Sequence, residues 1–289
     1  MPPMDHSLPW APPPFELARP ACQAGPVMFA SPHSGRNYPA DFIEAARLDP
    51  TSLRRSEDSF VEELFAGVPG CGAPLLAATF PRAYCDPNRE PWELDPGMFA
   101  DELPSWVNTT SARVGAGLGT LARVVATGEG IYRDKLRFQE AEFRVETCWK
   151  PYHAMLEALI NETRTQFGVC LLIDCHSMPA NVGRGAPPDI VLGDAHGTAC
   201  AGRLTRLVEQ TLSAMGYIVR RNDPYAGGFV TRHYGRPREG VHALQIEIAR
   251  SLYMDEARFV RRAGFLPLQA NMTALAAKLV REASAALAG

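Results

Sequence analysis

The chain lacks long apolar runs and an excess of either charge. No stretch of about 18 consecutive apolar residues occurs among its 289 residues, so we expect no transmembrane helix. The 29 Lys and Arg residues nearly balance the 32 Asp and Glu residues, which leaves a formal net charge of −3. Because neither sign dominates, we expect no nucleic acid and no membrane surface as a partner. The oligomeric state is left open.

Cysteine spacings typical of disulfide or metal frameworks are also missing. The chain has seven Cys, an odd number, and no Cys-x-x-Cys pair, which disfavours a disulfide framework and a cysteine-bound zinc. Cys170 and Cys175 lie in or beside an apolar run and are predicted to be small core residues. Residues 1–14 are rich in proline and lack the basic and apolar segments of a secretory signal. We therefore expect a loosely packed arm over residues 1–20. The cysteine pattern, which disfavours disulfides, is typical of a cytoplasmic protein.

Segments with strand and helix periodicity alternate along the rest of the chain. This order predicts one α/β domain over residues 21–289. Strands are expected at 27–30, 74–78, 169–173, 189–192, 217–220 and 241–248. Helices are expected at 58–65, 103–126, 140–167 with a break or cap near Pro151, 198–215, and 259–287 with a break near Pro267. The proline-rich segment 86–104 is expected to be a functional loop, and the glycine-rich segment 222–235 a flexible loop that closes over a substrate.

Two histidines directly follow apolar runs that are typical of buried strands. His33 lies in Ser-Pro-His-Ser-Gly and His176 in Asp-Cys-His-Ser-Met. Strand ends of open α/β sheets collect ligands and catalytic groups, and a catalytic zinc takes three His or carboxylate ligands. The pair therefore predicts a metal site, with Glu57 or Asp58 as the third ligand. The alternatives are a hydrogen-bonded turn for each histidine and a helix N-cap for Asp58.

Other catalytic patterns are missing. Without a Gly-x-Ser-x-Gly elbow, a serine hydrolase that uses Ser34 or Ser177 is disfavoured. The glycine-rich segment lacks phosphate-loop spacing, which disfavours nucleotide binding. Four further histidines are expected to be structural or peripheral, namely His153, His196, His233 and His242.

Five short motifs occur in an order that resembles the N-formylglutamate amidohydrolase family. They are Ser-Pro-His-Ser-Gly at 31–35, Asp-Ser-Phe-Val-Glu-Glu-Leu-Phe at 58–65, Asp-Pro-Asn-Arg at 86–89, Asp-Cys-His-Ser-Met at 174–178, and Gln-Ile-Glu at 245–247 with Tyr-Met at 253–254. This family is similar to zinc carboxypeptidases and aspartoacylase-type deacylases. The resemblance therefore implies a zinc-peptidase-like, three-layer α/β/α fold with a mixed, mostly parallel sheet and one Zn²⁺ at its carboxyl edge.

The resemblance also implies roles for individual residues. His33, His176 and a carboxylate, for which we favour Asp58, are the implied zinc ligands. Carboxypeptidase-type relatives place a His and a Glu three residues apart, a spacing absent here because Arg36 occupies that position. Glu247, an acidic residue in an otherwise apolar strand, is the predicted general base, with an ordinary salt bridge as the alternative.

Arginine side chains are predicted to bind the carboxylates of the substrate, because a guanidinium group can form two parallel hydrogen bonds to a carboxylate. Asn88 and Arg89 form the predicted clamp, and Arg89 is also expected to polarise the formyl carbonyl. Arg82 is a second clamp residue or a structural ion pair. Further predicted contact residues are Arg133, Tyr225 and Arg232, with a plain surface turn as the alternative for Tyr225.

These expectations describe one reaction. Metal-activated water hydrolyses the amide bond of N-formyl-L-glutamate, or of a similar N-acyl amino acid, to formate and glutamate, a step of histidine degradation. One alternative is a related zinc amidase or peptidase with another acyl or peptide substrate. The other is a non-catalytic binding protein on the same scaffold.

Overall fold

The computed structural model describes residues 13–180 and 187–288, which fall into two compact units. The first unit holds residues 13–16, 32–57 and 78–155, and the second holds residues 17–31, 58–77, 156–180 and 187–288. The single domain expected over residues 21–289 stays a prediction. Residues 1–12 of the expected arm lie outside the described residues.

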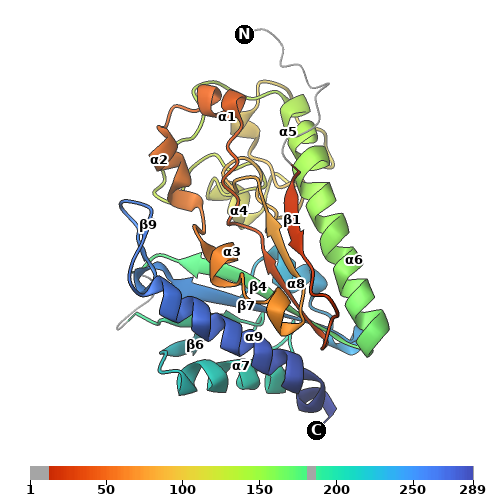
Figure 1. The fold of residues 1–289 in the computed structure, drawn as a ribbon. Coiled ribbons are helices and arrows are strands. Elements are labelled where there is room, and N and C mark those ends of the chain that lie inside the picture. Colours follow the sequence, from red (N-terminus) through yellow and green to blue (C-terminus); the bar gives the residue numbers. More distant parts are fainter. Residues whose placement is uncertain (1–12, 181–186, 289) are drawn as a thin grey trace. The chain divides into compact units, whose positions relative to one another are not determined.

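A seven-stranded sheet forms the centre of the second unit (Figure 1). Its strands follow the order β1-β3-β2-β4-β7-β5-β6. The β2–β3, β2–β4, β4–β7 and β5–β6 pairs are parallel, and the β5–β7 pair is antiparallel. The predicted mixed, mostly parallel sheet is therefore confirmed. The strands are β1 Phe15–Ala18, β2 Val27–Ser31, β3 Leu75–Ala78, β4 Cys170–Met178, β5 Ile190–Gly193, β6 Val219–Arg221 and β7 Val241–Ala249, with β8 Met254–Asp255 and β9 Val260–Arg261 in a separate hairpin.

Helices lie on both sides of the sheet, as the α/β prediction requires (Figure 1). The second unit holds α3 Val61–Leu64, α7 Gly202–Ala214, α8 Phe229–Tyr234 and α9 Phe265–Ala288. The first unit holds α1 Ala40–Ala45, α2 Pro50–Leu53, α4 Ala112–Gly115 and α5 Phe138–Arg144. A π-helical turn, η4 Val145–Trp149, leads from α5 into α6 Lys150–Phe167. Single 3₁₀ turns are η1 Arg54–Ser56, η2 Pro69–Cys71, η3 Pro96–Met98, η5 Pro237–Glu239 and η6 Arg250–Leu252.

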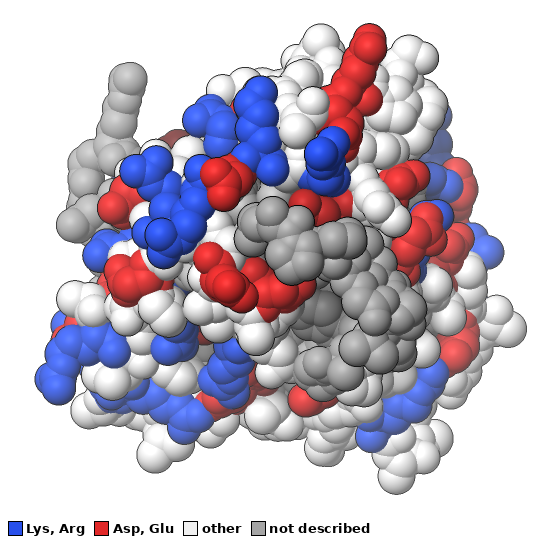
Figure 2. All heavy atoms as spheres, turned by 90° about the horizontal axis from the view of Figure 1, so that it is seen from above, with Lys and Arg blue, Asp and Glu red and all other residues white. Residues whose placement is uncertain are grey.

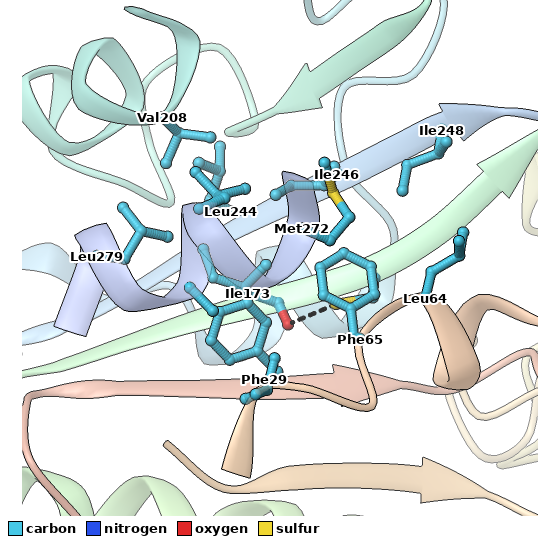
Figure 3. Packing of buried hydrophobic residues seen from close by; sticks show 14 of the residues in the cluster. Phe29, Leu64, Phe65, Ile173, Val208, Leu244, Ile246, Ile248, Met272 and Leu279 are labelled. Atoms are coloured by element: carbon cyan, nitrogen blue, oxygen red, sulfur yellow. Dashed lines mark hydrogen bonds between the residues drawn. The ribbon is translucent and has the colours of Figure 1, made fainter. Parts of the chain in front are cut away.

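The core of the second unit lies between the sheet and the helices α7 and α9. Alternate residues of a strand point to opposite faces, so Ile173 of β4 and Leu244 and Ile246 of β7 enter this core together. Val208 of α7 and Met272 of α9 pack against them (Figure 3). Burying one such side chain contributes about 1.5–3 kcal/mol. The intervening residues of β4 and β7 are therefore held on the opposite face of the sheet.

Two expected helices are shorter than their composition suggests. Residues 103–126 contain only the four-residue helix α4, because the chain turns at Gly117, whose φ is +75°. In the segment 58–65 only Val61–Leu64 is helical, since Phe60 has a left-handed φ of 69°. The helical prediction was wrong for most of the first segment and for the start of the second.

Proline positions and a loop also differ from expectation. The helix near Pro151 is not broken: α6 begins at Lys150, directly after the widened π turn, and Pro151 is its second residue. Pro267 lies in the first turn of α9, where its missing N–H would have no partner in the helix. The predicted loop 222–235 contains helix α8, and the strand expected at 169–173 runs to Met178. His176 therefore lies within a strand, not after it.

The surface carries charges of both signs, and the cysteines are thiols. Lys and Arg side chains lie among Asp and Glu side chains on the face drawn in Figure 2. All seven Cys are free thiols, and five of them are buried. Among the described residues, no helix has both the length and the apolar character needed to cross a membrane.

Candidate metal centre

Polar side chains occupy the face of β4 and β7 opposite the apolar core. Asp174 and His176 alternate with core residues on β4, and the strand register places Gln245 beside Asp174 and Glu247 beside His176. All four side chains are buried. The Gln245 amide donates a hydrogen bond of 2.7 Å to Glu247 Oε1. Two neighbouring strands thus place a histidine, two carboxylates and an amide on one small area of the sheet.

His176 lies between two carboxylates. Its Nδ1 is 3.1 Å from Asp58 Oδ2, and its Nε2 is 3.1 Å from Asp174 Oδ2. Burial works to lower the pKa of His176, but Asp174 and Asp58, with Glu247 nearby, outweigh it and hold this pKa well above its ordinary value. The surroundings of His176 therefore favour a positive charge at this position.

Asp58 is held by contacts within the second unit. Arg250, itself buried, donates hydrogen bonds of 3.1 Å to Asp58 Oδ1 and to Ser177 Oγ. The next carbonyl along the chain, that of Ser59, accepts a hydrogen bond of 3.0 Å from the Tyr253 hydroxyl. The first residue before α3 is Phe60, so the helix N-cap considered for Asp58 is wrong.

His33, in the first unit, has a carboxylate partner of its own. Its Nε2 lies 2.7 Å from Asp86 Oδ1. Arg82 donates a hydrogen bond of 2.7 Å to Asp86 Oδ2, and the backbone N–H of Asn88 donates one of 2.8 Å to Oδ1. Burial tends to raise the pKa of Asp86, but Arg82, His33 and Arg89 outweigh it and hold this pKa well below its usual value. Asp86 is therefore a buried carboxylate that stays ionised.

Arg89 and Glu57 have well-defined partners in the first unit. Arg89 is buried and donates hydrogen bonds to the carbonyls of Leu118 (2.8 Å) and Asn88 (2.7 Å). Its terminal nitrogen is 3.8 Å from Asp86 Oδ2. The Glu57 carboxylate accepts two hydrogen bonds of 3.0 Å from Arg54. This pairing engages Glu57, the other carboxylate considered as the third ligand.

Three of the predicted residues form a group that could hold a metal ion. His33, Asp58 and His176 are buried, and each offers one ligand atom to this group. Within the part of the chain that the structure describes, no other group of three or more His, Cys, Asp or Glu side chains meets this description.

The remaining predicted contact residues are spread over both units. Tyr225 packs beside an apolar cluster that includes Val191 and Ala249. Arg232 is exposed on α8, and exposed Arg133 donates a hydrogen bond of 2.8 Å to the Ala46 carbonyl. The roles predicted for these residues, and for Asn88, Arg89 and Arg82, stay predictions.

The other histidines have local contacts. His153 Nε2 donates to the Pro87 carbonyl at 2.8 Å, and its ring stacks on Trp149. His242 accepts a hydrogen bond from the Ala201 N–H. The ring of His233 stacks on Phe229. His196 is exposed, and its backbone N–H donates a hydrogen bond to Asn222 Oδ1.

Sequence reasoning missed Asp174 and Arg250. A signal for Asp174 was present, because residues two apart on a strand share a face and Asp-x-His therefore places both side chains together. Arg250 gives no comparable signal, since its contact with Asp58 joins positions 192 residues apart.

The buried histidine–carboxylate group, with Glu247 beside His176 on the sheet, has the ligand types of catalytic metal sites in hydrolytic enzymes. The chain belongs to the N-formylglutamate amidohydrolase family, whose sequence model matches residues 25–254. This match confirms the family prediction, and the similar proteins that follow confirm the prediction of an amide-bond hydrolase.

Similar proteins cover most of the chain. The N-formylglutamate deformylase of Pseudomonas putida is 30% identical over 237 residues, which are 80% of this chain and 82% of that protein. That of Pseudomonas aeruginosa is 31% identical over 82% of this chain and 86% of its own. The crystal structure of N-formylglutamate amidohydrolase from Ralstonia eutropha JMP134 has a TM-score of 0.88 at 39% identity, with 93% of this chain and 97% of that chain covered.

Proposed function

We propose that the protein is a zinc-dependent amidohydrolase that cleaves N-formyl-L-glutamate to formate and L-glutamate. The observation that carries the proposal is the position of His176, which lies 3.1 Å from the Asp58 carboxylate and beside Glu247 on the neighbouring strand. The names of the similar proteins support the choice of substrate. The cytoplasmic location and the place in histidine degradation stay predictions.

The residues present fit a zinc ion. Two imidazoles and one carboxylate form a ligand set used by catalytic zinc sites, which leave a further position open. Three buried carboxylates, Asp58, Asp174 and Glu247, also surround His176 and favour a cation there. In this proposal His33, Asp58 and His176 hold the ion. When bound, zinc supplies Lewis acidity that lowers the pKa of water to about 7 and polarises a carbonyl group.

Glu247 is proposed to move the proton. Its carboxylate takes a proton from the attacking water and delivers it to the amide nitrogen as the bond to the formyl carbon breaks, so that formate and the free amino group of glutamate are released. The hydrogen bond from Gln245 to Oε1 holds this carboxylate in one orientation. A fixed orientation matters because a general base must lie within hydrogen-bond reach of the proton that it removes.

Binding of the substrate's two carboxylates is proposed to rely on cationic residues. Arg89 and Asn88 are the proposed clamp, and Arg89 also polarises the formyl carbonyl in this scheme. Arg82, Arg133, Arg232 and Tyr225 remain proposed contact residues. Arg82 forms an ion pair with Asp86. This contact favours a role in which Arg82 orients the loop that carries Asn88 and Arg89.

The proposal is tested by release of formate from N-formyl-L-glutamate by the zinc-loaded protein. N-acetyl-L-glutamate, N-formyl-L-leucine and a glutamyl dipeptide serve as comparisons for the acyl group, the side-chain carboxylate and the peptide bond. We expect kcat/KM to be highest for N-formyl-L-glutamate. Higher kcat/KM for another compound would favour the related amidase or peptidase. A protein that binds about one zinc and hydrolyses none of these compounds would favour the binding protein.

A further inference from the structure

Both proposed histidine ligands have a buried carboxylate at the same ring nitrogen. In the first unit, His33 Nε2 lies 2.7 Å from Asp86 Oδ1. In the second unit, His176 Nε2 lies 3.1 Å from Asp174 Oδ2. Asp174 has no exposed surface and Asp86 is 3% exposed. Neither carboxylate belongs to the group of three residues that could hold the metal.

Asp174 is placed by the strand itself. It lies two residues before His176 on β4, so both side chains leave the same face of the sheet, and β4 pairs with β7 over all nine of its residues. A carboxylate buried in this way is costly unless a positive or hydrogen-bonding group faces it. Among the described residues, neither Asp174 oxygen has a hydrogen-bond partner, and His176 Nε2 is the positive group at ion-pair distance, 3.1 Å from Oδ2. The Nδ1 of the same ring faces Asp58.

Asp86 lies in a loop and not on a strand, but hydrogen-bond donors of the first unit hold its carboxylate. Arg82, four residues earlier in the chain, lies 2.7 Å from Oδ2, and the Asn88 backbone N–H lies 2.8 Å from Oδ1. These two donors fix the position of the carboxylate, whose Oδ1 also lies 2.7 Å from His33 Nε2. A loop in the first unit and a strand in the second thus each place an aspartate beside the Nε2 atom of a histidine.

We propose that Asp86 and Asp174 are positioning residues that hold His33 and His176 with the proton on Nε2, so that each ring presents Nδ1 to the metal. The inference rests on the proposed zinc site and deepens it. Metal-binding histidines commonly donate their second ring N–H to a carboxylate, which fixes the tautomer and the ring plane and makes the ligating nitrogen more basic. Arg82 then acts through Asp86.

The first test is zinc affinity, measured by competition with a chromophoric chelator. Asp86→Asn and Asp174→Asn keep the shape of each side chain but remove its charge, and we expect each to weaken zinc binding by about 10- to 100-fold. Asp194→Asn is the matched control. Asp194 is also a buried carboxylate, and it accepts hydrogen bonds from Gly197, Thr205 and Asn222. Its substitution should leave zinc affinity unchanged.

The outcomes separate the two proposals. Tight zinc binding by the unmodified protein together with affinities within about threefold in both Asn variants would overturn the positioning role and leave the zinc site intact. Absence of zinc binding by the unmodified protein would overturn both. If all three variants weaken binding equally, the loss is a general effect of removing a buried charge, and the positioning role is rejected.

The second test needs no variant. In zinc-loaded, ¹⁵N-labelled protein, long-range proton–nitrogen spectra distinguish the protonated from the metal-bound ring nitrogen of each histidine. We expect two histidines with metal-bound Nδ1 and protonated Nε2. A metal-bound Nε2 on either ring contradicts the inference, even if a variant fails to fold.

Discussion

Replacement of Glu247 by Gln is the substitution that isolates the proposed proton transfer. The two side chains have the same shape, and the amide oxygen can still accept the 2.7 Å hydrogen bond from Gln245. Because Glu247 lies on the central strand β7 and is 7% exposed, the change leaves the packing of the sheet as it was. What disappears is the negative charge and the ability to take up a proton.

The size of the effect follows from the role assigned to this carboxylate. Positioned acid–base groups contribute roughly 10²- to 10⁴-fold to a rate, which corresponds to about 3–5 kcal/mol of the activation barrier. We expect Glu247→Gln to lower kcat by this factor. KM should change by less than about threefold, because no binding role is assigned to the group.

The assay is formate release from N-formyl-L-glutamate, with metal content measured on the same samples. Glu282→Gln is the matched control, since Glu282 pairs with Lys278 one turn away on the surface of α9. The control should keep kcat within about twofold. Glu247→Gln should bind zinc as the unmodified protein does, because this residue is not a proposed ligand. A variant with full metal content and unchanged kcat would refute the assignment of Glu247 as general base.

Three further predictions concern stability and reactivity. Ile173→Ala leaves a cavity in the core beneath β4 and should lower the free energy of unfolding by about 2–5 kcal/mol in urea titrations, and a loss below about 1 kcal/mol would contradict the packing described. Arg250→Met removes a buried partner of Asp58 and should destabilise the metal-free protein by about 3–5 kcal/mol, so an unchanged thermal midpoint would show that this pair is not needed. Cys22 is exposed and should react with a thiol reagent within minutes. Burial raises the pKa of Cys175 well above its usual value and should protect this thiol until the protein unfolds. Rapid labelling of both would argue against the burial of β4.

Much of the sheet could be predicted because its strands are continuous apolar runs. The runs that begin at Val27 and Ile190 form strands within a residue or two of the expected bounds. The strand through His176 was expected to end at Ile173, because Asp174 and His176 look like loop residues. They are strand residues that face away from the apolar core, so local polarity concealed the length of β4.

Composition was a poorer guide to the helices. Residues 103–126 are rich in Ala and Leu, yet a left-handed Gly117 turns the chain after four helical residues. Intrinsic helix propensity is a weak determinant where turns and tertiary contacts compete with it. The glycine-rich segment around Gly228 was predicted to be a loop. The Gly228 N–H donates a hydrogen bond of 2.8 Å to Gln245 Oε1, and helix α8 begins at the next residue, Phe229.

The candidate ligands could be named from motifs, but their surroundings could not. The choice of Asp58 over Glu57 gains support from the contacts with His176 and Arg250. Such contacts depend on strand register and on long-range pairing, and no local pattern records these. The proximity of Glu247 to His176, for example, follows from the parallel pairing of β4 and β7, whose residues are about seventy positions apart.

The most direct test of the account is removal and return of the metal. The protein is treated with a chelator, freed of it by dialysis, and titrated with zinc while formate release from N-formyl-L-glutamate is followed. We predict that activity falls to background and returns in proportion to zinc, with full recovery at about one ion per chain. Full activity in protein that contains no measurable metal would contradict the central claim that His33, Asp58 and His176 hold a catalytic zinc ion.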